Sequence, residues 1–437
     1  MPGPHASSEE IRDDGMDPTQ VKAEPADSRP TGAAGPDAAG PDAAGPGPRP
    51  RVGVWLVGAR GSVATTVVTG ASAMRARLVP PVGMAGETAE FAGAGLPSLD
   101  DLVFGGHDVA STPLPKRAAE LAQAGVVPAH LVSLVEDELA AADAEIRDGA
   151  GGPLREHEDQ ATAARRLADD ISSFRDRHEL RRVVVVNVSS TEPRFAAGPE
   201  HQDPAVLGRA LRGGRDVLPA SSLYAYAAIL AGCPFVDFTP STGMRLPALG
   251  LLAQERALPY AGSDGKTGET LLRSALAPMF TGRALRVLAW SGTNLLGGGD
   301  GATLADPLAA ASKTTSKGQG LRGMLGHRTD GDTRIDYVPA LGDWKTAWDH
   351  VLFEGFLGVR MTMQVTWQGC DSALAAPLVL DLARFTARAH EAGCSGPLGA
   401  LGYYFKDPLG TTEHRLPEQY RILQDWACAL GRPAGAA

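Results

Sequence analysis

The stretch RVGVWLVGARGSVATTVVTGASAM, residues 51–74, decides how the fold of this sequence is interpreted. Its apolar run Val52–Val57 predicts a buried strand, and the run from Ser62 onward predicts a helix. The turn between them, Gly58–Ser62, contains two glycines, as a βα unit that binds a dinucleotide requires. The full G-x-G-x-x-G pattern is absent, however, and no acidic residue stands about 20 positions onward. From this motif alone, a tight turn without a ligand remains an alternative.

Two further apolar runs repeat the plan of a buried strand with a polar carboxyl end. They are RRVVVVNVSSTEP (181–193) and CPFVDFTPS (233–241), the second with Thr239 at its tip. Helices are predicted between the strands, at 115–124, 159–177 and 221–231. Strands that alternate with helices indicate a Rossmann-like, doubly wound parallel α/β sheet. Because ligands bind such sheets at the carboxyl ends of the strands, a cofactor would lie against these polar tips.

The composition along the chain predicts four segments. Residues 1–49 are rich in Pro, Gly and Ala and read as a disordered extension. Residues 51–259 form the Rossmann-like domain. Residues 260–371 contain the alternating stretch VRMTMQVTW (359–367) and predict a second, α+β domain. Residues 372–430 begin with a long amphipathic helix that we expect to return the chain to the first domain.

Charge and composition exclude several classes of protein. The net charge of −10 argues against nucleic-acid binding, and no apolar run is long enough to predict a membrane span. The N-terminus lacks the pattern of a secretory signal. The four cysteines stand far apart without a CxxC pair, so we expect neither a zinc site nor disulfides, and a cytoplasmic location.

Lysine is scarce in this chain, with seven lysines among 41 basic residues. A lysine that is retained where arginine is the usual choice can be needed as a compact, titratable ammonium. Lys313 and Lys317 are four residues apart, so on a helix they would share one face and repel each other unless an anion lay between them. A sugar phosphate is such an anion. The alternative is a solvated pair of surface lysines.

Two polar features complete the candidate cofactor site. The segment LLGGGDG (295–301) would let the backbone approach a flat ligand closely, with Asn294 and Asp300 as polar groups beside it. Asp108, after the sequence FGGH, can bind ribose hydroxyls, and Arg60 can lie along the phosphates. An ordinary turn would also explain the glycines.

Taken together and in this order, the motifs resemble those of the inositol-3-phosphate synthase (myo-inositol-1-phosphate synthase) family. The similarity runs from about Arg51 to Leu430. It implies NAD as the cofactor, a homotetramer, a role in inositol and phospholipid biosynthesis, and an isomerase that converts glucose 6-phosphate to inositol 3-phosphate without net redox change. No metal, nucleic acid or membrane is implied as a partner.

The resemblance also implies the residues of the site. The matching catalytic positions are Lys313, Lys317, Lys345, Lys406, Asp264, Asn294 and Asp371. The matching cofactor positions are Gly58, Ala59, Arg60, Gly61, Asp108, Val188, Ser189, Ser190, Thr191, Thr239, Asp264, Thr267, Gly298, Gly299, Asp300, Lys313, Asp343, Asp371 and Ser372. In the reaction that the family catalyses, NAD oxidises C5 of the open-chain sugar, enolisation and aldol closure follow, and C5 is reduced again. Lys313 would move the C5 hydroxyl proton with help from Lys406, while Lys317 and Lys345 would hold the phosphate and the C1 oxygen.

The sequence departs from the family pattern at four positions. Leu295, Gly298 and Gly299 replace the His and paired Asn of the family's Asn-rich loop, and Ser263 replaces the first of two adjacent aspartates. These changes leave open a related cyclase that acts on another sugar phosphate, such as fructose 6-phosphate. An NAD-dependent dehydrogenase with net redox output is a further alternative.

Overall fold

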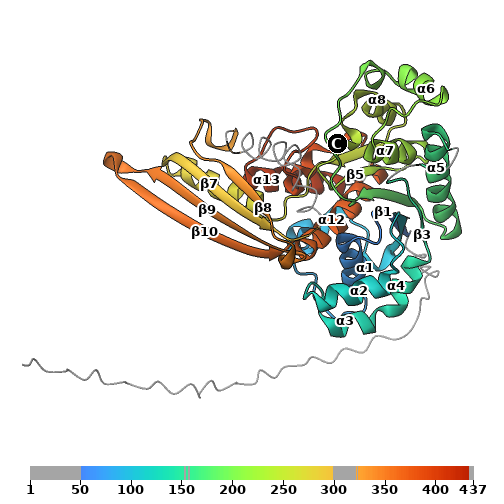
Figure 1. Ribbon diagram of the computed structural model, residues 1–437, viewed down its shortest axis with the longest axis horizontal. Coiled ribbons are helices and arrows are strands. Elements are labelled where there is room, and N and C mark those ends of the chain that lie inside the picture. Colours follow the sequence, from blue (N-terminus) through green and yellow to red (C-terminus); the bar gives the residue numbers. More distant parts are fainter. Residues whose placement is uncertain (1–50, 152–153, 156–157, 299–320, 322, 433–437) are drawn as a thin grey trace, which may run out of the picture. The chain divides into compact units, whose positions relative to one another are not determined.

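The first domain is built on a parallel sheet of seven strands. Figure 1 shows this sheet with helices packed around it. This computed structural model describes residues 51–151, 154–155, 158–298, 321 and 323–432. The strand order is β11-β6-β5-β4-β1-β2-β3, and every pairing in the sheet is parallel. The strands are β1 (Val52–Val57), β2 (Leu102–Asp108), β3 (Ile146–Asp148), β4 (Arg182–Asn187), β5 (Phe235–Asp237), β6 (Pro259–Gly262) and β11 (Gly396–Pro397). The predicted Rossmann-like fold is confirmed, and the predicted N-terminal extension lies outside the described residues.

Helices cover both faces of this sheet because side chains alternate along each strand. In β1, Val54 and Leu56 join one apolar cluster, whereas Trp55 and Val57 join the other. The first face is covered by α1 (Ser62–Arg75), α2 (Leu114–Gln123), α3 (Ala129–Leu134), α4 (Glu136–Asp143) and α12 (Asp371–Glu391). The second face is covered by α5 (Gln160–Arg177), α6 (Pro204–Arg212), α7 (Ala220–Leu230) and α8 (Pro247–Glu255). The last helix, α13 (Leu416–Leu430), packs against α12.

The connection between α1 and β2 explains why the expected acidic residue was missing from the dinucleotide pattern. Residues 76–101 form an insertion that contains three short 3-10 helices, Ala85–Glu87, Ala89–Ala94 and Leu99–Asp101. The second strand therefore begins only at Leu102, and Asp108 ends it. Asp108 thus occupies the end of β2, where a dinucleotide fold places its ribose-binding carboxylate, although the sequence spacing is about 50 residues.

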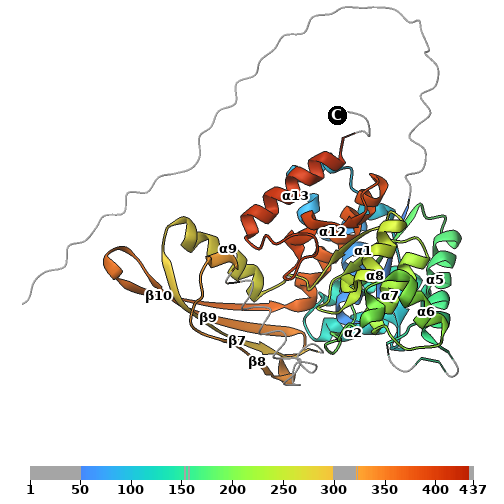
Figure 2. The same ribbon diagram turned by 90° about the horizontal axis from the view of Figure 1, so that it is seen from above.

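The second domain is a mixed sheet of four strands in the order β10-β9-β7-β8. They are β7 (Arg286–Leu296), β8 (Thr333–Tyr337), β9 (Trp344–Glu354) and β10 (Arg360–Cys370). Figure 2 shows α9 (Glu269–Gly282) along one face of this sheet, where Phe280 packs with Trp290 and Val351. The seven-stranded sheet extends to Gly262, three residues past the predicted domain boundary, because β6 pairs with β5 and β11. No helix in the described part of the chain is both long and apolar enough to cross a membrane.

A buried ion network joins α9 to the second sheet. The guanidinium of Arg273 donates to Asp349 Oδ1 at 2.8 Å and pairs with Glu269 at 2.5 Å. Trp290 Nε1 donates to the same Asp349 oxygen at 2.7 Å, and Asn294 Nδ2 donates to Glu269 at 2.9 Å. Burial raises the pKa of Asp349, and Arg273 opposes that shift. The amide that we predicted to be catalytic, Asn294, is therefore engaged in this network under the sheet.

Removal of the Arg273 cation should destabilise the second domain strongly. We expect Arg273→Met to lower the free energy of unfolding by about 3–5 kcal/mol, because two buried carboxylates would lose their shared partner. Urea denaturation followed by tryptophan fluorescence measures this loss. The matched control is Arg286→Met, which removes a side chain that is 70% exposed and should cost less than about 1 kcal/mol. Equal stability of the two variants would contradict the interpretation.

Candidate active site

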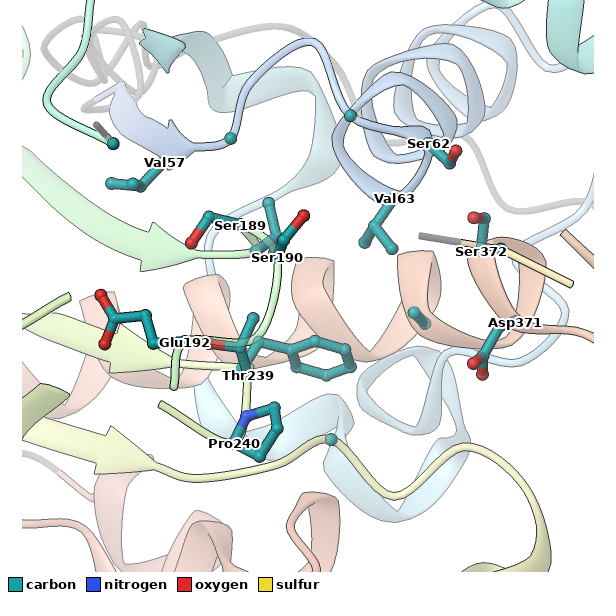
Figure 3. Close-up of a pocket in the computed structure, with 18 of the residues that line it drawn as sticks. Val57, Ser62, Val63, Ser189, Ser190, Glu192, Thr239, Pro240, Asp371 and Ser372 are labelled. Carbon is teal, nitrogen blue, oxygen red and sulfur yellow. The ribbon is translucent and has the colours of Figure 1, made fainter. Parts of the chain in front are cut away.

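One cavity of about 550 Å³ lies at the carboxyl ends of β1, β2, β4 and β5 and reaches the start of β9 and α12. Figure 3 shows Ser62 and Val63 at the start of α1, Ser189 and Ser190 after β4, and Asp371 and Ser372 at the start of α12 around it. The predicted residues that line it are Gly58, Arg60, Gly61, Asp108, Val188, Ser189, Ser190, Thr239, Asp264, Thr267, Gly298, Asp343, Lys345, Asp371, Ser372 and Lys406.

Other predicted residues lie elsewhere or are not described. Ala59, Thr191 and Asn294 are not among the residues that line the cavity. Ala59 is buried next to the turn, where its N–H donates to the carbonyl of His107 at 3.1 Å. Gly299, Asp300, Lys313 and Lys317 lie outside the described residues.

The glycine turn is held against β2 and β4 so that its backbone faces the cavity. Gly58 has a φ of +83°, and a Cβ there would lie 2.8 Å from the Cα of Ser189, so no larger residue fits. The carboxylate of Asp108 accepts from the N–H of Arg60 at 2.6 Å and from that of Ala110 at 2.7 Å. The N-cap residue of α1 is Gly61, which has no side chain that could accept from the first N–H groups of the helix. These N–H groups therefore keep their donor capacity towards the cavity.

The Arg60 side chain lines the cavity and is also tied to neighbouring elements. Its Nε pairs with Asp143 Oδ1 at 2.9 Å, and its NH1 donates to the carbonyl oxygen of Ala110 at 2.9 Å. Its course along the phosphates stays a prediction. The uncapped end of α1 is a second positive element that faces the cavity.

The tips of β4 and β5 are fixed by a buried polar group that sequence reasoning did not single out. Asn187 Nδ2 donates to Asp237 Oδ1 at 3.0 Å and to Thr239 Oγ1 at 3.1 Å, and Asn187 Oδ1 accepts from Ser189 Oγ at 2.7 Å. Burial raises the pKa of Asp237 to about 7. Glu192, which also lines the cavity, accepts from both the N–H and the hydroxyl of Ser221. These groups position the predicted serines and threonine at the cavity wall.

Two lysine–aspartate pairs form the opposite end of the cavity. Lys345 Nζ pairs with Asp371 and donates to Thr267 Oγ1 at 3.0 Å. Burial alone would raise the pKa of Asp371, but Lys345 outweighs it and lowers that pKa to about 2. Lys406 Nζ pairs with Asp264 Oδ1 at 2.7 Å. The side chains of Lys345 and Lys406 are only 13% and 17% exposed, so both ammonium groups are held at the wall instead of in solvent.

Chain segments far apart in sequence supply these pairs. Asp264 and Lys406 meet because Gly262–Lys266 pairs with Tyr404–Leu409: Lys406 N donates to Asp264 O at 2.7 Å and Ser263 N to Asp407 O at 2.9 Å. Lys345 is the second residue of β9 and Asp371 begins α12, and the N–H of Asp371 donates to the carbonyl of Asp343 at 3.1 Å. The tertiary structure thus places a nucleotide-type turn and two paired lysines in one cavity.

Comparison with known proteins gives the family of this chain. A family model described as myo-inositol-1-phosphate synthase matches residues 94–428. The chain belongs to the myo-inositol-1-phosphate synthase family. Inositol-3-phosphate synthase 1 of Bacteroides thetaiotaomicron is 33% identical over 409 residues, which cover 86% of this chain and 93% of that relative. The human inositol-3-phosphate synthase 1 is 31% identical over 385 residues, 77% of this chain and 68% of the human protein.

Solved structures of this family share the fold. Inositol-3-phosphate synthase of Caenorhabditis elegans superimposes with a TM-score of 0.77 at 22% identity and covers 88% of this chain and 86% of the other. A myo-inositol-1-phosphate synthase-related protein of Thermotoga maritima gives a TM-score of 0.70 at 23% identity, over 86% and 98% of the two chains. The prediction of the family from the ordered motifs is confirmed.

NAD is the cofactor of this family member, and the residues around the cavity fit it. The uncapped start of α1 and the close Gly58 turn suit the pyrophosphate, while Asp108 at the end of β2 suits the adenosine ribose. Both Asp108 oxygens already accept backbone N–H groups, but a carboxylate has lone pairs left for ribose hydroxyls.

Loss of the Asp108 carboxylate should loosen the turn and weaken NAD binding. We expect Asp108→Ala to lower the affinity for NAD about tenfold or more, because two backbone N–H groups lose their acceptor and the ribose loses its partner. Calorimetric titration with NAD measures the change. Asp137→Ala, which removes an exposed carboxylate on α4, is the matched control and should bind NAD as the unaltered chain does. An unchanged affinity of Asp108→Ala would refute this role.

Proposed function

We propose that this chain is an NAD-dependent isomerase, an intramolecular lyase, that converts D-glucose 6-phosphate to 1D-myo-inositol 3-phosphate. Membership in the synthase family supports the reaction. The observation that carries the proposal is the cavity in which Lys345–Asp371 and Lys406–Asp264 face the same space as the glycine turn. An ordinary nucleotide-binding domain would need neither of these buried, paired ammonium groups.

The chemistry needs positive charge that is fixed before the reaction begins. NAD, when bound, accepts a hydride from C5 of the open-chain sugar and later returns it. Negative charge then develops on the C5 oxygen, on the enolate and on the oxygen of the closing ring in turn. Fixed ammonium groups stabilise such charge by roughly 3–4 kcal/mol each, because they need no reorganisation when it appears.

Lys406 and Lys345 would stabilise different negative charges, because they lie at different places in the cavity wall. We assign Lys406 to the C5 oxygen. Asp264 holds the ammonium of Lys406 in place and can accept a proton from it. We assign Lys345 to the substrate phosphate or the C1 oxygen, with Thr267 and Asp371 fixing its direction. Lys313 remains the group that we propose to move the C5 hydroxyl proton, and Lys317 a further phosphate ligand.

Turnover should require the paired lysines and show no net redox change. We expect the chain to form inositol 3-phosphate from glucose 6-phosphate with NAD present and without steady accumulation of NADH. Lys345→Met should reduce kcat by about a hundredfold or more, because one fixed charge of the site is lost. Product formation followed by NMR measures both. Lys116→Met, an exposed lysine on α2, is the control and should keep full activity.

The same assay separates the alternatives. Conversion of fructose 6-phosphate in preference to glucose 6-phosphate would identify a different carbocyclase. Stoichiometric NADH would identify a dehydrogenase. Either result would overturn the proposed reaction.

We further propose that the protein is a homotetramer that works in the cytoplasm. The four cysteines are all unpaired, which favours a reducing compartment. For assembly, the support is the face of the second sheet opposite α9, where Trp348 is 40% exposed between Thr293 and Thr366 on the neighbouring strands. The β9–β10 turn also exposes Phe356 and Leu357, at 88% and 83%. Apolar side chains this exposed are typical of a contact with another copy.

Assembly can be tested on this sheet face. We expect native mass spectrometry to show four copies of the 45.3 kDa chain, and Trp348→Arg to shift the population towards smaller species because it places a charge in an apolar contact. Leu251→Arg, at a site 44% exposed on α8, is the control and should leave the mass unchanged. An unchanged tetramer in Trp348→Arg would exclude this face from the interface.

A further inference from the structure

A third lysine lies on the same short link that carries Asp264 and Lys406. The link is the pairing of Gly262–Lys266 with Tyr404–Leu409, in which Gly265 bridges to Phe405 and Lys266 N donates to the carbonyl of Tyr404 at 2.8 Å. Lys406 lines the cavity, whereas Lys266 does not. Lys266 therefore lies behind the wall that Lys406 helps to form, and the reaction as proposed above does not use it.

The surroundings of Lys266 differ from those of the two lysines in the cavity. Its side chain is buried, with the residue 4% exposed, and its Nζ donates to Oε1 of Gln419 in α13. Among the described residues no carboxylate forms an ion pair with it, whereas Lys345 and Lys406 each have an aspartate. A buried ammonium that donates to a neutral acceptor keeps more of its electrostatic field than one that is paired with a carboxylate.

The acceptor is itself fixed in orientation. The amide nitrogen of Gln419 donates to the carbonyl of Gly402 at 3.0 Å and to that of Glu413 at 2.7 Å. Its oxygen must therefore face Lys266, and no rotation can offer the lysine a different partner. The arrangement holds an amine in one place without neutralising it.

The charge of Lys266 and that of Lys406 act on each other. Burial first, and Lys406 second, lower the pKa of Lys266 to about 7. The pKa of His414, on the segment before α13, is lowered by its own burial and by Lys266. The other charged groups around this amine are Asp264, Asp407 and Glu413. Lys266 is thus charged below about neutral pH and loses that charge above it.

We propose that Lys266 is a positioning residue for Lys406: its ammonium, fixed by Gln419, repels that of Lys406 and holds it against Asp264 at the cavity wall. The effect on turnover rests on the proposed cyclisation, while the coupling between the two lysines does not. A lysine that only tied α13 to the link would have a different signature, because its loss would change stability without changing how turnover depends on pH.

Two substitutions at this position separate charge from structure. Lys266→Met removes the charge at similar length, and Lys266→Arg keeps a charge that does not titrate below about pH 12. We expect Lys266→Met to lower kcat about tenfold near pH 6.5, with KM for glucose 6-phosphate changed less than about threefold. Lys266→Arg should retain kcat there. Above about pH 8 the kcat of the unaltered enzyme should approach that of Lys266→Met, while Lys266→Arg should keep its kcat.

A measurement without turnover tests the coupling directly. The chain has seven lysines, so labelling lysine Cε with ¹³C gives few signals, and each is assigned by substitution. We expect the signal of Lys266 to titrate near neutral pH and to move to higher pH by about half a unit or more in Lys406→Met, because the neighbouring charge that lowers its pKa is lost. Lys116→Met, which removes an exposed lysine on α2, should leave the Lys266 titration unchanged.

The outcomes are distinct. An unmoved Lys266 titration in Lys406→Met overturns the proposal, as does an equal loss of kcat in Lys266→Met and Lys266→Arg at every pH. If Lys266→Met fails to fold, the pH dependence of kcat is compared between Lys266→Arg and the unaltered enzyme. Identical pH profiles would refute a role for the titrating charge. A chain that does not convert glucose 6-phosphate at all overturns the proposed function, and the ¹³C titration still decides the role of Lys266.

Discussion

The site depends on one stretch of backbone pairing, between Gly262–Lys266 and Tyr404–Leu409. It joins the end of β6, which lies next to the edge strand β11, to a segment about 140 positions later, with the whole second domain between them. Each hydrogen bond of such a pair contributes only about 1 kcal/mol, but buried N–H and C=O groups that lack partners would cost more. Once the pairing forms, Asp264, Lys266 and Lys406 have no freedom to separate.

The second constraint is that α12 serves both domains at once. Its first residue, Asp371, takes part in the site through Lys345, and its middle packs on α1 against the seven-stranded sheet. Because one rigid helix spans these contacts, the position of β9 relative to the glycine turn follows from the packing of the first domain. The end of the cavity that carries the two lysine–aspartate pairs is thereby fixed by the apolar core, whose burial is the largest favourable term in folding.

Charge in this protein is handled in two ways. Under the second sheet, Arg273 pairs with two carboxylates, Glu269 and Asp349, so its positive charge is more than compensated. At the cavity, each lysine has one aspartate and faces space that an anion can enter, and Lys266 behind them has a neutral partner. Compensated charge stabilises a fold, whereas incompletely compensated charge is available for binding and catalysis.

The sequence alone determined the doubly wound sheet, because buried strands, glycine turns and helices have local periodicities that one segment displays by itself. It also determined the family, since the ordered motifs from Arg51 onward can be recognised without knowing which residues they contact. Only the tertiary structure decided what each polar side chain does. Asn294 lies in a buried ion network, Arg60 is drawn to Asp143, and Asn187 fixes the strand tips, none of which spacing could reveal. The reason is physical: periodicity reports which face of an element is apolar, but a hydrogen bond or an ion pair needs a partner whose position is set only when distant segments pack together.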